Sequence, residues 1–322
     1  MGIRGLGGFL KWKVPTARKN IVWSVYAGQR WAIDCSCLLY RAKGSRLSAI
    51  TVLASLLVRM KAARIEPIVI FDGRTPVVKT ETVEARRIVR EAAHKEIAEL
   101  TTVLRDSTLT EGERADREIR AQALQAKAPQ VTARDRDDIK KFLYAAGVLF
   151  VTAAEEADDV LAYMARMGII NGVVSTDMDM LARGVPLLVV PETPDTSVLS
   201  AISLGHVLSE LRLRFEQFVN ACVLMGTDYT PKGWRTMVPA AAVEIARRGV
   251  DWGALDASGG VCIALETNVD QLMGVGVSLE RLLADSQREK LTAGTPAREA
   301  DNLTIICEAQ GWPADWLCIL MS

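Results

Sequence analysis

The chain has 322 residues, which is enough for one large or two modest domains with a sizeable core. Hydrophobic residues make up 49% and charged residues 24%, which excludes a disordered chain, and no run reaches the roughly 18 apolar residues of a membrane span. The 39 basic and 39 acidic residues cancel, and six scattered cysteines with two histidines disfavour a disulfide scaffold, a zinc site and an imidazole base.

The first part of the chain is strongly basic. Residues 1–46 hold nine Lys and Arg side chains against one acid, Asp34, and no apolar secretion signal opens them, so we expect an intracellular, reducing location. A basic run alone is typical of a solvated face. Asp34, however, ends the apolar run 31–33, which predicts a buried strand, and an unpaired carboxylate there would cost several kcal/mol. Asp34 therefore needs a cation.

Three further apolar runs predict strands, and each of them also ends in acid. They are residues 67–71 before Asp72, residues 147–151 before Glu155, Glu156, Asp158 and Asp159, and residues 172–176 before Asp177 and Asp179. Helical patterns such as residues 160–167 alternate with these runs, which favours an α/β fold with a mainly parallel central sheet flanked by helices. Ligand sites of such folds lie beyond the carboxyl ends of the strands, where all four acidic groups fall.

One more acid, Asp228, follows a predicted helix over residues 215–224. Any one of these acids is typical of a turn or a helix cap. Gathered in one crevice, they could not all ionise without divalent cations, because like charges raise each other's pKa. Oxygen ligands favour Mg²⁺, with Mn²⁺ as a substitute, and two such ions about 3.5–4 Å apart support phosphodiester hydrolysis. The acidic groups at the four strand ends, with Asp228, therefore predict a two-metal site.

A long charged helical stretch follows Asp72. Lys79, Arg86 and Arg90 lie at i, i+7 and i+11, which places them within roughly 40° of one helical face. A solvated helix surface is the alternative interpretation. The end of the chain, residues 251–322, holds four basic and eleven acidic side chains and repels phosphate, so nucleic acid would meet the N-terminal part.

The same C-terminal region has helical patterns around residues 269–283 and 300–310. We expect it to pack on the core, with a protein partner as the alternative. It carries no evident sliding-clamp peptide.

In its motifs, the chain resembles the flap endonucleases of the XPG family of structure-specific 5′ nucleases. The order and spacing of these motifs cover about residues 1–250. The resemblance implies a PIN-like nuclease core over residues 1–250, followed by the acidic helical region 251–322. Within the core it implies a helical arch or cap over about 77–135 and a helix-two-turn-helix-like region over 216–249. The matching segments are residues 1–6, 32–36, 71–76, 156–159, 176–179 and 224–229.

The resemblance also assigns roles to single residues. It implies that metal is bound, directly or through water, by seven acids, with Asp159 as a possible further ligand. These acids are Asp34, Asp72, Glu156, Asp158, Asp177, Asp179 and Asp228. It implies that Lys79 and Arg86 contact the scissile phosphate and that residues 97–133 form a cap that orders around a threaded strand. The implied DNA contacts are Gly2, which lets the N-terminus approach the site, Tyr40, which stacks on a base, and Arg87, Arg90, Lys232 and Arg235.

The chain departs from the family after Asp228, because the paired glycines of the helix-two-turn-helix turn are missing from residues 230–239. Those glycines allow the backbone to approach a duplex phosphate closely. Duplex contact is therefore expected from Lys232 and Arg235, together with Arg247 and Arg248 on a helix predicted over residues 240–248.

The implied activity is that of a Mg²⁺-dependent 5′ flap endonuclease or 5′ exonuclease. Its substrates would be branched DNA with 5′ flaps or free 5′ ends, cut during replication, repair or recombination in the nucleus or at another site of DNA replication. Two alternatives stay open, an RNA endonuclease of the same fold and a non-catalytic nucleic-acid-binding scaffold. No membrane partner is expected.

Overall fold

The computed structural model describes residues 2–76, 80–105, 109–228, 230, 236–250 and 299–321. Within these ranges seven strands form one sheet, in the order β1-β7-β6-β5-β2-β3-β4. The five strands from β6 to β4 pair in parallel, whereas β7 pairs antiparallel with both β1 and β6. The strands are β1 (Arg18–Asn20), β2 (Arg30–Asp34), β3 (Glu66–Phe71), β4 (Leu149–Thr152), β5 (Gly172–Val174), β6 (Leu187–Pro191) and β7 (Leu199–Ser203).

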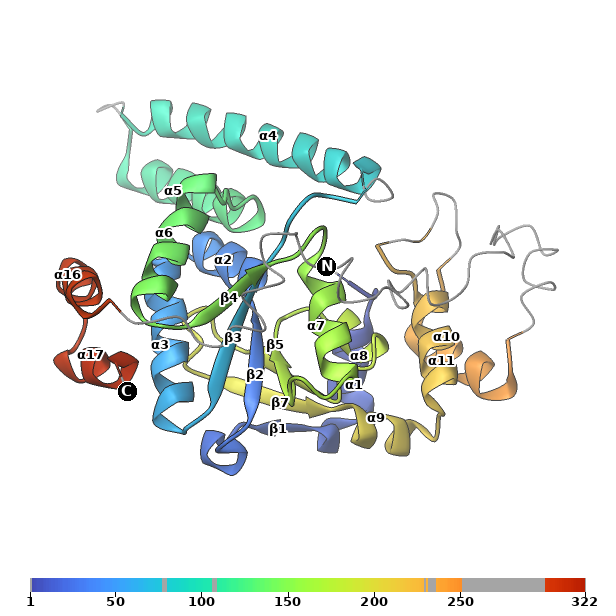
Figure 1. Cartoon of the computed structure of the whole chain (residues 1–322). Helices are drawn as coiled ribbons and strands as arrows, with labels where there is room; N and C mark the ends of the chain where they lie inside the picture. The colour runs from blue at the N-terminus through green and yellow to red at the C-terminus, as the bar shows by residue number, and fades with distance from the viewer. Residues whose placement is uncertain are drawn as a thin grey trace.

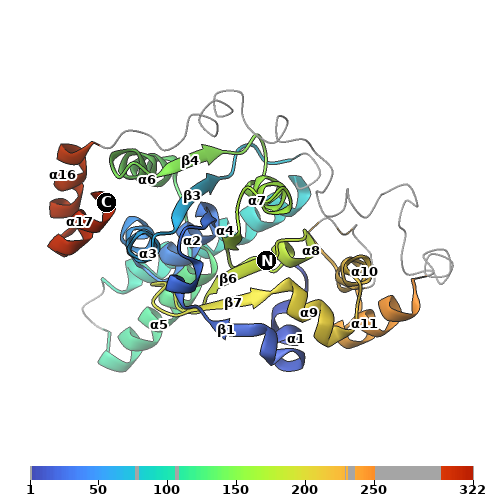
Figure 2. The same ribbon diagram turned by 60° about the horizontal axis from the view of Figure 1, so that its bottom comes forward.

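Helices cover both faces of the sheet (Figures 1 and 2). One face packs against α1 (Leu6–Lys13), α7 (Ala157–Arg166), α8 (Asp179–Ala182), α9 (Leu204–Leu211), α10 (Phe215–Met225) and α11 (Pro239–Arg248). The other packs against α2 (Cys35–Gly44), α3 (Ala49–Ala62) and α6 (Ala133–Ala145). Successive side chains of a strand point to opposite faces, so Ala32 of β2 joins the first core while Trp31 and Ile33 join the second.

The four acid-tipped strands predicted from sequence are β2, β3, β4 and β5, and they are neighbours in the parallel part of the sheet. Their carboxyl ends therefore lie along one edge, and α4 (Thr80–Val103) crosses over that side of the molecule (Figure 1). The mainly parallel α/β fold is confirmed. The antiparallel edge formed by β7 with β1 and β6 was not predicted.

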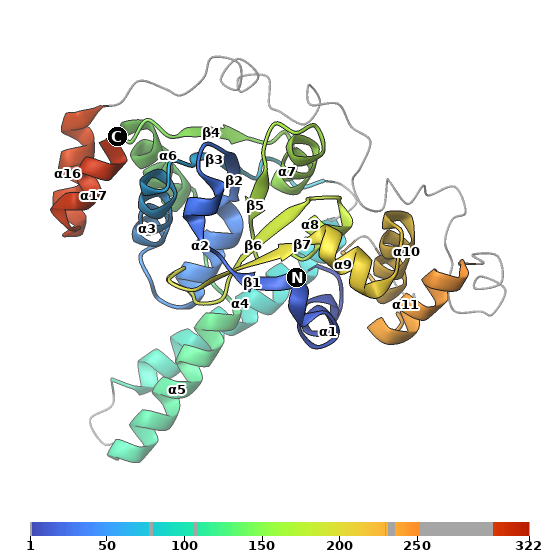
Figure 3. The same cartoon turned by 90° about the horizontal axis from the view of Figure 1, so that it is seen from below.

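A helical hairpin occupies most of the predicted arch. α4 pairs with α5 (Glu111–Lys127), whose start is fixed by a capping box between Thr110 and Glu113. The hairpin projects from the body (Figure 3), and its base is tied to the end of α2, where Arg46 Nε donates to Gln125 Oε1 at 2.9 Å. α6 begins at Ala133, near the predicted arch boundary of about 135, and packs into the body.

The described part of the C-terminal region packs on the core, as predicted. α16 (Ala300–Gln310) and α17 (Ala314–Met321) lie beside α3 and α6 (Figure 1) and bury Leu303, Cys307 and Leu320. Trp312 Nε1 donates to Thr51 Oγ1 at 3.1 Å. The helix predicted around residues 269–283 lies outside the described residues. Among the helices that the structure describes, none combines the length and the apolar character needed to cross a membrane.

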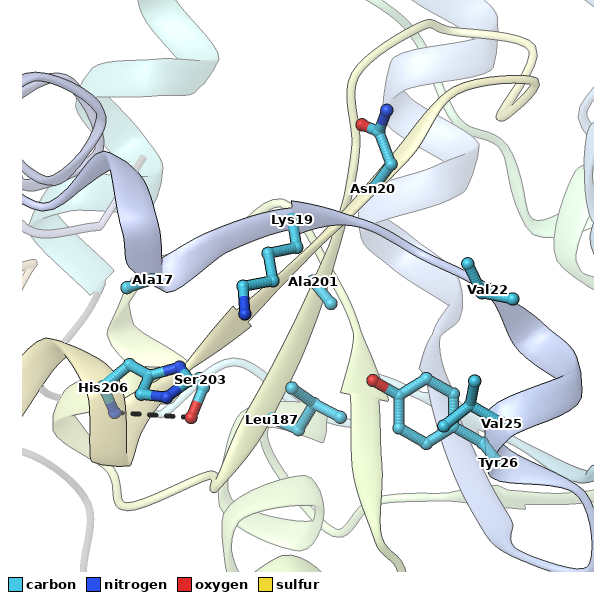
Figure 4. Close-up of a pocket in the computed structure, with 10 residues that line it drawn as sticks. All are labelled: Ala17, Lys19, Asn20, Val22, Val25, Tyr26, Leu187, Ala201, Ser203 and His206. Atoms are coloured by element: carbon cyan, nitrogen blue, oxygen red, sulfur yellow. Dashed lines mark hydrogen bonds between the residues drawn. The ribbon is translucent and has the colours of Figure 1, made fainter.

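A separate hollow of about 300 Å³ lies at the opposite end of the sheet (Figure 4). Leu187, at the start of β6, forms part of its floor, so it opens at the amino-terminal ends of the parallel strands. Its other walls come from β1, β7, the 3-10 turns Pro15–Ala17 and Trp23–Tyr26, and α9, which contributes His206. The described residues that line it include no carboxylate, so this hollow does not supply the predicted ligand set.

Candidate active site

Two of the predicted acids are held by partners from neighbouring strand ends. Asp34 ends β2 and caps α2, with its carboxylate accepting from the Cys37 amide at 3.1 Å and from the Ser175 hydroxyl at 2.8 Å. Asp72, which follows β3, accepts from the Ala157 amide at the start of α7 at 2.9 Å. These hydrogen bonds join the end of β2 to the residue after β5, and the residue after β3 to the start of α7, which follows β4.

The residues after β5 bring two more acids against the N-terminus. Asp177 Oδ1 accepts from the Asp179 amide at 2.9 Å, and Asp179 Oδ1 accepts from the Ile3 amide at 2.6 Å. A Cβ on Gly2 would lie 2.6 Å from Asp179 Oδ1 and closer still to Asp177 Oδ1. Gly2 also has a φ of 90°, which favours glycine. This geometry places Gly2 and Ile3 beside the acids.

The pKa values of three carboxyls show that the acids lie close to one another. Burial raises the pKa of Asp34 to about 7, and the charges of Asp72 and Asp177 add to the rise. Burial also raises the pKa of Asp179 to about 7, with Asp177 adding to it. The pKa of Asp158 lies well above its usual range, chiefly because of burial, and Asp177, Asp34 and Asp72 contribute in the same direction. Acids from four strand ends therefore share one crevice.

Two further predicted ligands lie at the border of this crevice. Glu156 is half-buried at the start of α7. Asp228 follows α10, adds to the rise in the pKa of Asp179, and accepts from Arg86 on α4 at 2.8 Å. Glu155, which is not among the predicted ligands, is exposed.

The donor set fits a hard divalent cation, because it consists of carboxylate oxygens. Asp34 and Asp179 are buried, and burial favours the neutral form of each carboxyl unless a cation offsets it. Across the ranges that the structure describes, no three Asp, Glu, His or Cys side chains already surround one point as metal ligands. The carboxylates instead rest on their own hydrogen-bond donors, which is expected where like charges repel. Metal ligation by the seven acids stays a prediction.

Two of the predicted cations of the arch, Arg86 and Arg87, have carboxylate partners in this structure. Arg86 pairs with Asp228, so α4 reaches the border of the crevice. Arg87 pairs with Glu84 and Glu91 on its own helix, both at 2.6 Å, which matches the solvated-surface interpretation for this residue. Arg90 is half-buried in α4. Lys79 lies outside the described residues.

The other predicted DNA contacts are only partly described. Tyr40 is half-buried in α2, and no contact in the structure tests its stacking role. α11 runs from Pro239 to Arg248, close to the predicted range 240–248, and both Arg247 and Arg248 pair with Glu244. Lys232 and Arg235 lie outside the described residues, so their contacts with DNA stay predictions.

The sequence interpretation missed three residues that shape the site. Ser175 orients Asp34, and its hydroxyl also accepts from the Asp177 amide at 3.1 Å. Gly73 joins the loop after β3 to the loop after β4, through its amide to the Glu155 carbonyl at 2.7 Å. Arg183 is buried and pairs with Asp159, the possible further ligand. The sequence does show Gly73 directly after the strand-end acid Asp72. It gives no signal for the contacts of Ser175 and Arg183, because their partners lie far away in the sequence.

Stability of the metal-free protein should fall as pH rises from about 4 to about 7. Asp34 and Asp179 keep protons in the folded state that the unfolded chain releases near pH 3.8, so the folded state binds more protons in this window. Thermal melts in EDTA at pH 5, 6, 7 and 8 should show Tm decreasing and then levelling. Added Mg²⁺ should remove most of the decrease, and a Tm that rises with pH in EDTA would contradict the prediction.

The fold and site define a class of α/β protein whose parallel strands end in a shared carboxylate crevice beneath a helical hairpin. The sequence matches the XPG N-terminal domain over residues 1–93 and the XPG I-region over residues 147–228. The chain therefore belongs to the XPG family.

Curated relatives share part of the chain. Flap endonuclease 1 of Babesia bovis is 28% identical over 245 residues, which cover 71% of this chain and 35% of the relative. Flap endonuclease 1 of Glycine max is 29% identical over 248 residues, which cover 71% of this chain and 62% of the relative. The chain thus spans about a third to two thirds of the length of these relatives.

Solved structures share the fold over nearly the whole chain. A flap endonuclease-1 from Methanococcus jannaschii has a TM-score of 0.61 at 21% identity, covering 97% of both chains. The catalytic core of Rad2 in complex with DNA substrate has a TM-score of 0.64 at 17% identity, covering 100% of both chains. Human GEN1 in complex with Holliday junction DNA has a TM-score of 0.62 at 15% identity, covering 99% of this chain and 77% of that one.

Proposed function

We propose that this protein is a divalent-metal-dependent, structure-specific 5′ nuclease. It would hydrolyse phosphodiester bonds in branched DNA with 5′ flaps or free 5′ ends, during replication, repair or recombination. The observation that carries the proposal is the shared crevice, in which Asp34, Asp158 and Asp179 have pKa values raised by burial and by neighbouring acids. The family membership supports it, as do the DNA named with the Rad2 and GEN1 structures and the Mg²⁺ and Mn²⁺ ions named with another GEN1 structure.

The chain supplies ligands and holds them in place. When bound, divalent ions activate water and stabilise the departing oxygen of a phosphodiester. Ser175 and the Ile3 amide fix the carboxylates of Asp34 and Asp179, so little conformational freedom is lost when a cation binds. The residues that would hold the ions are Asp34, Asp72, Glu156, Asp158, Asp177, Asp179 and Asp228.

The helix above the crevice supplies positive charge for the scissile phosphate. Arg86 lies at the border of the acids, 2.8 Å from Asp228, and a planar guanidinium matches the geometry of phosphate oxygens. A phosphate placed between α4 and the acids would offer Arg86 a second anionic partner. We assign Arg86 and Lys79 to stabilising charge on the phosphate oxygens, as fixed cations suit such a role.

The DNA path is proposed from residues around the same edge of the sheet. Gly2 lies against the acids, and Tyr40 lies on α2, the helix that Asp34 caps. We assign Tyr40 to base stacking, worth about 1–3 kcal/mol per base, and the lysine and arginine side chains to phosphates. The proposed DNA contacts are Gly2, Tyr40, Arg87, Arg90, Lys232 and Arg235.

A substrate competition tests the function. A DNA duplex with a labelled 5′ flap is offered with Mg²⁺, with Mn²⁺ and with EDTA, beside an RNA flap of the same sequence and a blunt duplex. We expect cleavage of the DNA flap in either metal, a 5′-phosphate on the downstream product, and none in EDTA. Preferred cleavage of the RNA would favour the RNA endonuclease, and tight flap binding without cleavage in any metal would favour the scaffold.

A further inference from the structure

One arginine lies inside the protein next to the acids. Of the residues that the structure describes, Arg183 is the one basic side chain that is buried, with 1% exposure. It follows α8, and its amide donates to the Asp179 carbonyl at 2.9 Å. Its guanidinium pairs with the carboxylate of Asp159 in the first turn of α7. The pair therefore connects the two helices that carry Asp158 and Asp179.

This contact sets Asp159 apart from the predicted ligands. Asp34, Asp72 and Asp179 accept hydrogen bonds from neutral amides or hydroxyls, which a cation can supplement. Asp159 instead balances a buried positive charge, and turning its carboxylate toward a metal ion would break this ion pair. Separating a buried ion pair in this way is strongly unfavourable.

The same guanidinium acts on the neighbouring acids. Its positive charge lies close enough to act on the carboxyls of both Asp158 and Asp179. A fixed cation behind the crevice also reduces the attraction that these acids exert on a divalent ion, because it cancels part of their charge.

We propose that Arg183 is a positioning residue that keeps Asp159 out of the metal ligand set and serves as a fixed positive charge behind the carboxylate crevice. Together with Asp159 it holds the first turn of α7 against α8. Divalent ions then bind without Asp159 and more weakly than the acids alone would allow. The inference rests on the proposed function, because it concerns the same crevice.

Direct Mn²⁺ binding to Arg183→Met tests the proposal without an activity measurement. Loss of the cation should tighten Mn²⁺ binding about three- to tenfold by electron paramagnetic resonance titration at pH 8. The Tm in EDTA should fall by about 10 °C, because Asp159 is left without its partner. If the substitution only disturbed packing, both Mn²⁺ affinity and Tm would fall. Tighter Mn²⁺ binding together with a lower Tm therefore distinguishes the proposed role from a packing defect. Unchanged or weaker Mn²⁺ binding would overturn it.

The double variant Asp159→Leu/Arg183→Met separates the two roles of Asp159. It removes the pair without changing the net charge, and replacing a buried ion pair by apolar side chains often leaves stability unchanged. Mn²⁺ affinity within about twofold of wild type supports the proposal, whereas a tenfold loss would identify Asp159 as a ligand. This variant decides the question even where Arg183→Met does not fold.

A matched control and a wild-type measurement complete the experiment. Arg59 is half-buried in α3, where Arg59 Nη2 donates to Thr196 Oγ1 at 2.7 Å, and Arg59→Met should leave Mn²⁺ affinity unchanged. Wild-type protein should bind Mn²⁺, and Asp34→Asn should abolish this binding. If the wild-type protein binds no Mn²⁺, the proposed function fails. If it binds Mn²⁺ and Arg183→Met does not tighten the binding, only the role of Arg183 is overturned.

Discussion

Replacing Asp179 by asparagine should lower 5′-flap cleavage at least about a thousandfold and also stabilise the metal-free protein at pH 8. Asparagine keeps the shape of the side chain and an oxygen that can accept from the Ile3 amide, now at 2.6 Å. It removes a charge that burial and Asp177 disfavour, as the pKa of about 7 shows. Because the charge is costly to the fold, its value must lie in holding a cation. Flap-cleavage rates in Mg²⁺ and thermal melts in EDTA measure the two effects.

The matched control is Asp195→Asn, the same change at an exposed carboxylate in the turn between β6 and β7. Hydrogen bonds from Thr193 and Ser197 lower the pKa of Asp195 to about 2, so its charged form stabilises the fold. Neutralising it should lower Tm slightly and leave cleavage unchanged. If Asp179→Asn instead loses stability, or keeps more than a tenth of the wild-type rate, the metal role assigned to Asp179 is wrong.

The strand ends could be predicted from the sequence because the signals are local. Short apolar runs such as residues 67–71 and 172–176 are long enough to mark strands, and the acid that follows each run lies at the predicted edge of the sheet. Parallel strands bring such acids together regardless of how far apart they are in sequence. The convergence of Asp34, Asp72 and Asp177 thus follows from a topology that the sequence indicates.

The features that the sequence did not indicate depend on distant pairings. β1 has three residues, Arg18–Asn20, and its strand conformation comes from pairing with β7, far along the chain. The buried Arg183 has no local signal, because an arginine after a short helix is usually solvated, and only the fold places Asp159 beside it. The sequence therefore left Asp159 as a possible further ligand beside Asp158, whereas the structure pairs it with Arg183.

Replacing Gly73 by alanine should lower the stability of the protein by about 3 kcal/mol, the cost of forcing an extra atom into a packed region. A Cβ at this position would lie 2.6 Å from the Ala154 carbonyl oxygen and closer to that of Ala153, and neither backbone group can move aside as a flexible side chain could. The two loops would have to separate. This would break the hydrogen bond that the Gly73 amide donates to the Glu155 carbonyl oxygen at 2.7 Å. A fall in Tm of about 6 °C is expected in thermal melts.

The same separation should reach the crevice. Gly73 directly follows Asp72, and the loop that it contacts leads into Glu156 and α7, so the two ligand groups would move apart. Flap cleavage should therefore fall about a hundredfold, because such catalysis depends strongly on exact placement. Gly112→Ala is the control, since a Cβ there meets no atom within 4 Å and alanine favours the helix α5. Equal melting temperatures and rates for the two variants would show that the contact between the loops does not hold the site together.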